Sequence, residues 1–144
     1  MRRPSATLVV DAAILVAAAR GRSSGALIEA NEARALITTD RAVEEARRRI
    51  ELGMKRPELL PILNALAAMM AVIPGGELGT LIPAAELGLR DAIASRDGST
   101  RDAHVLALAW EADADVWTTD RDFAGAGVAS WSTRNLMRAL ADVE

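Results

Sequence analysis

Residues 6–21 read ATLVVDAAILVAAARG, and this stretch decides the fold. Its first five residues, 6–10, form a short apolar run that ends at Asp11, which predicts a buried strand. Residues 12–20 predict a helix that stops at Gly21. The chain is therefore expected to open with a strand that leads directly into a helix.

The rest of the chain repeats this alternation. Further strands are predicted at residues 36–39, 70–73, 116–119 and 128–131. Helices are predicted at residues 24–34, 41–52, 57–69, about 83–94, 99–111 and from Ser132 onward. Such alternation implies a parallel sheet with helices on both faces. With no linker, repeat or low-complexity segment in view, residues 1–144 are expected to form a single α/β domain with three layers, α/β/α, around a mostly parallel sheet.

Composition narrows the chemistry. Hydrophobic residues make up 51% of the chain, which is enough for a sizeable core. The absence of cysteine excludes disulfides, thiolate zinc sites and cysteine nucleophiles. His104 is the single histidine, so an all-histidine metal site is excluded as well. Any hydrolytic activity must then depend mainly on carboxylates.

No apolar run approaches the roughly 18 residues that a membrane helix needs. The apolar stretch 8–19 is too short and contains Asp11, so we expect a cytoplasmic protein that does not cross a membrane.

The net charge of −3 gives no support for nucleic-acid binding by itself, but basic residues cluster between residues 41 and 56. This cluster could contact phosphates. The simpler interpretation, which we favour, is a solvated helix face with Glu44–Arg48 and Glu45–Arg49 ion pairs.

Acidic residues stand where parallel sheets bind ligands, beyond the carboxyl ends of strands. Asp11 follows the first strand, Asp120 follows the strand 116–119, and Asp102 lies in the first turn of a helix. Each also has a purely structural alternative: Asp11 as a helix N-cap, Asp102 in a capping pair with Ser99, and Asp120 in an Asx turn. If the strands before Asp11 and Asp120 are neighbours, their carboxylates face one pocket.

Several carboxylates packed together repel one another, and a divalent cation relieves that repulsion. Ligation by oxygen alone favours Mg²⁺ or Mn²⁺ over zinc. Such an ion can activate water and stabilise charge on a phosphodiester, so a site without cysteine can still hydrolyse RNA.

The segment Asp102-Ala-His-Val-Leu-Ala-Leu-Ala, followed by Val116-Trp-Thr-Thr-Asp-Arg-Asp-Phe123, resembles the C-terminal half of a PIN domain. The opening Leu8-Val-Val-Asp11 resembles the first strand of that family. The likeness extends over about residues 6–140, and the chain resembles the VapC toxins of this family. It implies a PIN-like fold and a metal-dependent nuclease.

The resemblance also implies a fourth acidic ligand. In PIN domains a helix glutamate follows, by six positions, a Ser or Thr at the end of the second strand, and Thr39 to Glu45 fits this spacing. Glu44 is one residue away and stays open as an alternative, as does a surface pair of Glu45 with Arg49. By the same resemblance Asp122 is an accessory residue that helps the site through a metal-bound water; the alternative is that it only shapes the loop before Phe123.

The remaining residues of interest have simpler roles. Thr118 is a second accessory candidate, because its hydroxyl could position a ligand or water. For His104 we expect a helix-packing or surface role in preference to a catalytic role. The tryptophans at positions 110, 117 and 131 and Phe123 are expected in the core.

The sequence therefore predicts a Mg²⁺- or Mn²⁺-dependent endoribonuclease, a hydrolase, with Asp11, Glu45, Asp102 and Asp120 as catalytic metal ligands. Resemblance to VapC implies a homodimer and a cognate antitoxin, as in a type II toxin–antitoxin pair. The alternative is a catalytically inactive PIN-like module for RNA binding or assembly, which retention of all four acidic positions disfavours. A haloacid-type phosphatase would need an Asp-x-Asp after the first strand, but Ala12 and Ala13 follow Asp11.

Overall fold

The computed structural model describes residues 2–90, 103–119 and 127–142. The strands are β1 (Thr7–Val10), β2 (Ala35–Thr39), β3 (Ala71–Ile73), β4 (Asp115–Trp117) and β5 (Ser130–Trp131). The α-helices are α1 (Ala12–Ala19), α2 (Ser24–Ala33), α3 (Asp40–Arg48), α4 (Leu60–Ala67), α5 (Ile82–Arg90), α6 (Ala103–Ala112) and α7 (Thr133–Asp142). Each predicted strand is therefore present, and every predicted helix overlaps an observed one, although residues 91–94 and 99–102 of two predicted helices lie outside the described residues.

The five strands form one sheet in the order β3-β2-β1-β4-β5, and every neighbouring pair is parallel. The α/β class is confirmed, and the sheet is entirely parallel. The first strand lies at its centre, between β2 and β4. Because all strands run the same way, the residues that follow β1, β2 and β4 meet at one edge of the sheet.

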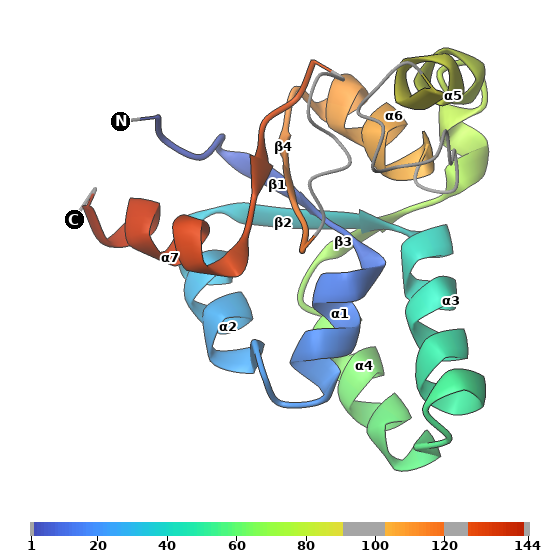
Figure 1. Cartoon of the computed structure of the whole chain (residues 1–144), viewed down its shortest axis with the longest axis vertical. Coiled ribbons are helices and arrows are strands. Elements are labelled where there is room, and N and C mark those ends of the chain that lie inside the picture. Colours follow the sequence, from blue (N-terminus) through green and yellow to red (C-terminus); the bar gives the residue numbers. More distant parts are fainter. Residues whose placement is uncertain (1, 91–102, 120–126, 143–144) are drawn as a thin grey trace.

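Helices cover both faces of the sheet, as the three-layer expectation required (Figure 1). Side chains alternate along β1, so Leu8 and Val10 pack on one face and Val9 on the other. The first face is covered by α1, α2, α3, α4 and α7. The second face is covered by α5 and α6, whose Leu89 and Leu106 are fully buried.

The charged helix after β2 differs in detail from the prediction of one α-helix over 41–52. It begins one residue earlier, at Asp40, and continues after Arg48 as a π-helical turn, Arg49–Gly53. The amide of Met54 donates to the carbonyl of Arg49 at 2.7 Å, five residues back, which defines this wider turn. Two short 3-10 helices, Pro57–Leu59 and Gly75–Leu78, complete the connections.

Within the part of the chain that the structure describes, no helix has the length and apolar character needed to cross a membrane.

Candidate active site at the carboxyl edge of the sheet

Asp11 is the residue that leaves the central strand at the carboxyl edge. Its side chain is 8% exposed, so the carboxylate is nearly buried. Oδ1 accepts a hydrogen bond from the amide of Ile14 at 3.0 Å, which makes Asp11 the N-cap of α1. The other carboxylate oxygen, Oδ2, accepts a hydrogen bond from the hydroxyl of Thr118. The capping alternative for Asp11 is thus confirmed, and the same carboxylate also faces the residues that follow β4.

The neighbouring strand β4 brings the segment before Asp120 to the same place. Val10 is in register with Trp117, and the amide of Asp11 donates to the Trp117 carbonyl at 3.2 Å. Thr118 is 2% exposed and lies directly beside Asp11. The expectation that the strands before Asp11 and Asp120 are neighbours is therefore confirmed.

Helix α3 presents two glutamates with different surroundings. Glu44 is 48% exposed and pairs with Arg47 at 2.6 Å and with Arg48 at 3.3 Å. The hydrogen bond from Arg47 is the main cause that lowers the pKa of Glu44 to about 2. Glu45 is 33% exposed and lies 3.6 Å from Arg49, a longer contact. Glu44 is thus committed to exposed ion pairs, whereas Glu45 is the more buried of the two.

Two threonines at the end of β2 make hydrogen bonds that connect neighbouring elements at the carboxyl edge of the sheet. The hydroxyl of Thr38 donates to the carbonyl of Val10 at 2.7 Å, which links β2 to the residue before Asp11. Thr39 Oγ1 accepts from the amide of Ala42 at 3.0 Å and so caps α3. It also lies 2.7 Å from Nδ1 of His104. The sequence predicts a role for Thr39 from its spacing to Glu45. Its contact with His104 joins residues 65 positions apart, so no local sequence pattern indicates it.

Three of the predicted residues, Asp102, Asp120 and Asp122, lie outside the described residues, as does Phe123. The described chain resumes at Ala103, the first residue of α6, and stops at Thr119. Within residues 2–90, 103–119 and 127–142, no group of three or more His, Cys, Asp or Glu side chains could hold a metal ion. Of the four predicted ligands the structure therefore describes Asp11 and Glu45.

The described donors are carboxylate oxygens, which suit Mg²⁺ or Mn²⁺. A carboxylate can accept about four bonds, so the hydrogen bonds from Ile14 and Thr118 to Asp11 are compatible with ligation of a cation.

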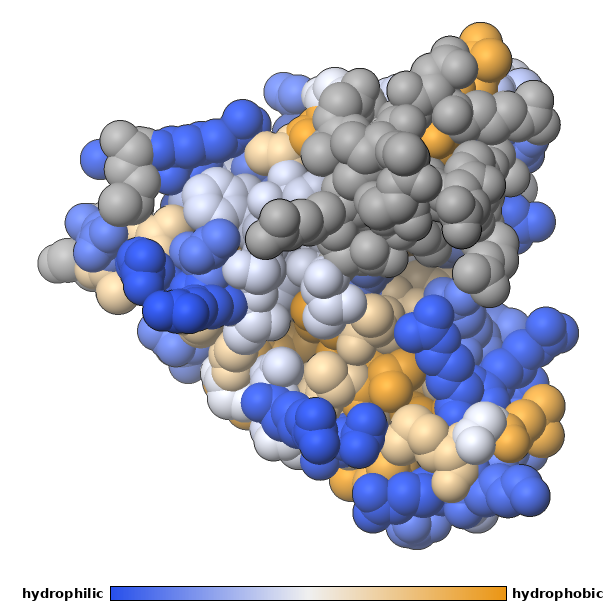
Figure 2. All heavy atoms as spheres, in the orientation of Figure 1, coloured by the Kyte–Doolittle hydropathy of each residue, from blue (hydrophilic) through white to orange (hydrophobic). Residues whose placement is uncertain are grey.

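Most arginines of the 41–56 cluster bind glutamates on the surface of α3 and the turn that follows. The predicted Glu44–Arg48 and Glu45–Arg49 pairs are both present, at 3.3 and 3.6 Å. Arg47 also contacts Glu51. Figure 2 shows hydrophilic side chains gathered over the side of the molecule that α3 occupies. The solvated-face interpretation of this cluster is thus confirmed for its ion pairs.

The tryptophans lie in or against the core. Trp117 is fully buried, whereas Trp110 and Trp131 are partly buried against the second and first core clusters, respectively. His104 is 5% exposed in α6, which confirms a helix-packing position for it.

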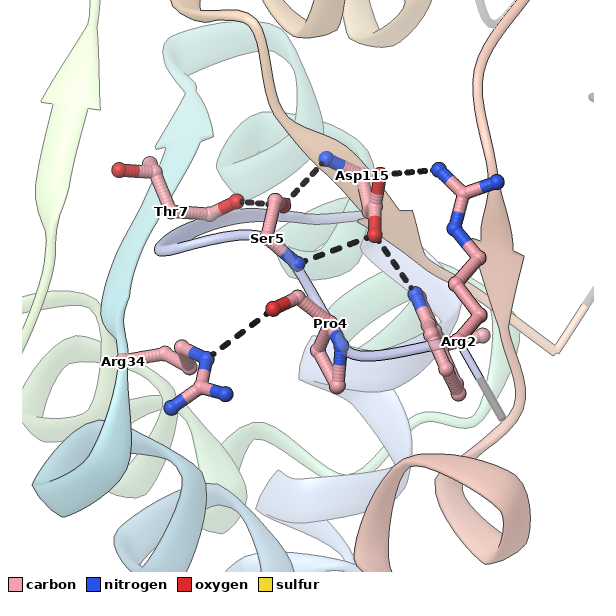
Figure 3. Close-up of polar contacts among 7 residues, drawn as sticks. Arg2, Pro4, Ser5, Thr7, Arg34 and Asp115 are labelled. Atoms are coloured by element: carbon pink, nitrogen blue, oxygen red, sulfur yellow. Dashed lines mark hydrogen bonds and ion pairs between the residues drawn. The ribbon is translucent and has the colours of Figure 1, made fainter. Parts of the chain in front are cut away.

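A separate polar cluster lies at the opposite, amino edge of the sheet (Figure 3). Asp115, the first residue of β4, is 6% exposed. Its carboxylate accepts hydrogen bonds from the amide of Ser5 at 3.1 Å, the indole of Trp131 at 2.9 Å and Arg2 at 3.3 Å. This cluster fixes the N-terminal segment to the sheet at the end of β4 farthest from Thr118.

An entirely parallel three-layer α/β domain with a buried aspartate at the carboxyl end of its central strand belongs to the class that binds ligands at that edge. The family model of the PIN domain matches residues 9–141, and the chain belongs to the PIN-domain family. PIN domains are generally nucleases and typically use divalent metal ions.

Two solved structures resemble the chain at the level of the fold. The first is PAE2754 from Pyrobaculum aerophilum, with a TM-score of 0.64 and 18% identity over 94% of this chain and 96% of that chain. The second is FitAcB from Neisseria gonorrhoeae, with a TM-score of 0.64 and 20% identity over 90% of this chain and 99% of that chain. No curated protein matches the sequence significantly.

Proposed function

We propose that this PIN domain is a metal-dependent endoribonuclease that hydrolyses RNA phosphodiester bonds, with Asp11, Glu45, Asp102 and Asp120 as its metal ligands. The observation that carries the proposal is the carboxylate of Asp11. It is nearly buried at the end of the central strand, and both of its oxygens are oriented by hydrogen bonds, from Ile14 and Thr118. A buried carboxylate held in this way is a preorganised ligand for a cation.

The ligands would come from four separate segments. Asp11 directly follows β1, and Glu45 lies in α3. Asp102 directly precedes α6, and Asp120 follows β4 by three positions. A bound Mg²⁺ or Mn²⁺ ion would stabilise negative charge on the phosphate and lower the pKa of attacking water. The chain's own contribution would be to orient the Asp11 carboxylate through the two hydrogen bonds that it accepts from Ile14 and Thr118.

Glu45 is the better of the two glutamates for this role. Glu44 already binds Arg47 and Arg48, so a metal ion would compete with two arginine cations for its carboxylate. The contact of Glu45 with Arg49, at 3.6 Å, is longer, so less ion-pair energy would be lost when Glu45 binds a metal. In this proposal Thr118 and Asp122 are accessory residues: Thr118 orients Asp11, and Asp122 lies two positions after Asp120.

The resemblance to VapC toxins supports a role as the toxin of a type II toxin–antitoxin pair. A cytoplasmic homodimer of the single domain 1–144, held inactive by a cognate antitoxin, belongs to the same proposal. Growth arrest on expression, relieved by the product of a small neighbouring reading frame, tests this biological role separately from the chemistry.

The cleavage assay compares the protein with its Asp11→Asn variant. Asparagine is as good an N-cap as aspartate, so α1 should remain intact while the charged ligand is lost. RNA cleavage with Mg²⁺ or Mn²⁺ should fall by at least roughly 100-fold, given that even residues outside the ligand set cost 10- to 100-fold in metal sites. Asp113→Asn is the matched control, because Asp113 is an exposed aspartate with φ 50°, a conformation that asparagine tolerates.

Equal cleavage by the wild type and Asp11→Asn would contradict the proposal. Wild-type protein that binds RNA but does not cleave it with either metal would favour the inactive binding module instead.

A further inference from the structure

His104 is the one polar side chain among the described buried residues of α6. The described buried residues of α6 are otherwise apolar: Ala103, Val105, Leu106, Ala107, Leu108 and Ala109. A buried imidazole costs free energy unless its nitrogens are hydrogen-bonded. Here Nδ1 lies 2.7 Å from the hydroxyl oxygen of Thr39, which is fully buried at the end of β2.

The direction of this bond depends on which ring nitrogen of His104 carries the proton. The Thr39 oxygen accepts from the amide of Ala42 at 3.0 Å as the N-cap of α3. When the proton is on Nε2, Nδ1 accepts the single hydroxyl proton of Thr39. The resulting chain runs from the Ala42 amide through the Thr39 hydroxyl to Nδ1, with the ring proton on Nε2.

This chain of hydrogen bonds connects the two helical layers. Residues of α3 pack in the core on one face of the sheet, and residues of α6 pack in the core on the other. The Thr39–His104 bond joins the start of α3 to the start of α6 at the carboxyl edge. Glu45 lies six positions after Thr39, and Asp102 lies two positions before His104.

We propose that His104 is a positioning residue of the metal site: by accepting the Thr39 hydrogen bond it fixes the start of α3 relative to the start of α6, and so sets the position of Glu45, which α3 carries. The inference rests on the proposed function, since Glu45 is a metal ligand only in that proposal. A residue that merely fills the core would contribute to stability without changing metal affinity.

The test compares His104→Asn with His104→Gln. An asparagine side-chain amide occupies the place of Nδ1 and can accept from Thr39, whereas the glutamine amide reaches the place of Nε2. Mn²⁺ affinity is measured by calorimetric titration without RNA. His104→Asn should bind Mn²⁺ nearly as well as the wild type, and His104→Gln should bind it about 10- to 100-fold more weakly.

Ser5→Ala is the control for a general loss of stability. Ser5 bridges Thr7 and Asp115 at the amino edge, far along the sheet from Thr39, and its loss should leave Mn²⁺ affinity unchanged. Because His104 is the single histidine, ¹⁵N NMR of the wild-type ring gives its tautomer without assignment. The ring proton is expected on Nε2, and exchange of the Ala42 amide should be faster in His104→Gln than in His104→Asn.

A ring proton on Nδ1, or equal Mn²⁺ affinity of the glutamine variant and the wild type, overturns the positioning role and leaves the nuclease proposal standing. A wild-type protein that binds no Mn²⁺ overturns both. If His104→Gln does not fold, near-wild-type Mn²⁺ affinity of His104→Asn together with an Nε2 proton supports the proposal, and weak binding by His104→Asn overturns it.

Discussion

The hydroxyl of Thr118 donates a hydrogen bond to Oδ2 of Asp11, so the residue that directly follows β4 orients the carboxylate that directly follows β1. Both side chains are almost fully buried, at 2% and 8% exposure. A hydrogen bond to a buried charge is stronger than one between neutral groups. The central strand and its neighbour thus share one polar contact at the edge where the catalytic site is proposed.

Replacing Thr118 by valine should therefore affect both stability and activity. Valine nearly retains the shape of the side chain, but the Asp11 carboxylate loses the hydrogen bond from residue 118. This loss should cost about 1.5–3 kcal/mol in the free energy of unfolding. RNA cleavage should fall by roughly 10- to 100-fold. Thr118→Ser keeps the hydroxyl and should retain most of the cleavage rate. Urea denaturation and single-turnover cleavage measure the two effects, and equal rates for the valine and serine variants would refute an orienting role.

The two glutamates of α3 should respond differently to neutralisation. Glu45→Gln removes a proposed ligand and should lower the cleavage rate by at least about 10-fold, with a matching loss of Mn²⁺ affinity. Glu44→Gln alters an exposed pair with Arg47 and should leave cleavage within about 2-fold of wild type, because exposed ion pairs contribute little. The opposite ranking in a cleavage assay would assign the ligand to Glu44.

The amino-edge cluster should matter for stability and not for chemistry. Asp115→Ala leaves the Ser5 amide and the Trp131 indole without their acceptor, which should cost about 2–4 kcal/mol in the free energy of unfolding. Arg2→Ala removes a partner that is 66% exposed and should cost less than about 1 kcal/mol. Under conditions where Asp115→Ala is folded, its cleavage rate should match the wild type; a large loss would place this cluster in the site.

The Glu44 carboxyl offers a pH test. Its pKa is lowered to about 2, chiefly by the hydrogen bond from Arg47. A group whose pKa is lower in the folded state stabilises the fold above its unfolded value of 4.5, and this contribution is lost as the pH falls toward 2. In ¹³C NMR titrations Glu44 should titrate near 2 in the wild type and closer to 4.5 in Arg47→Gln. An unchanged pKa in the variant would show that the pair does not form in solution.

Much of the fold could be predicted from local patterns. The run ending at Asp11 and the helix after it follow from apolar residues bounded by a capping aspartate and by Gly21, which has φ 86°. The i,i+4 pairs of α3 were equally local, since side chains four apart on a helix are neighbours. The π-helical turn at Arg49–Gly53 was not predicted, because apolar spacing does not distinguish it from the end of an α-helix.

The sequence by itself determined which residues can form strands and helices, that the sheet is mostly parallel, and that any hydrolytic chemistry would depend mainly on carboxylates. Only the tertiary structure decided which strand ends meet: the order β3-β2-β1-β4-β5 puts Thr118 beside Asp11 and brings Thr39 to His104. The physical reason is that backbone periodicity is encoded over a few neighbouring residues. A hydrogen bond between side chains 65 or 107 positions apart exists only once burial of the two apolar cores has fixed the strand order.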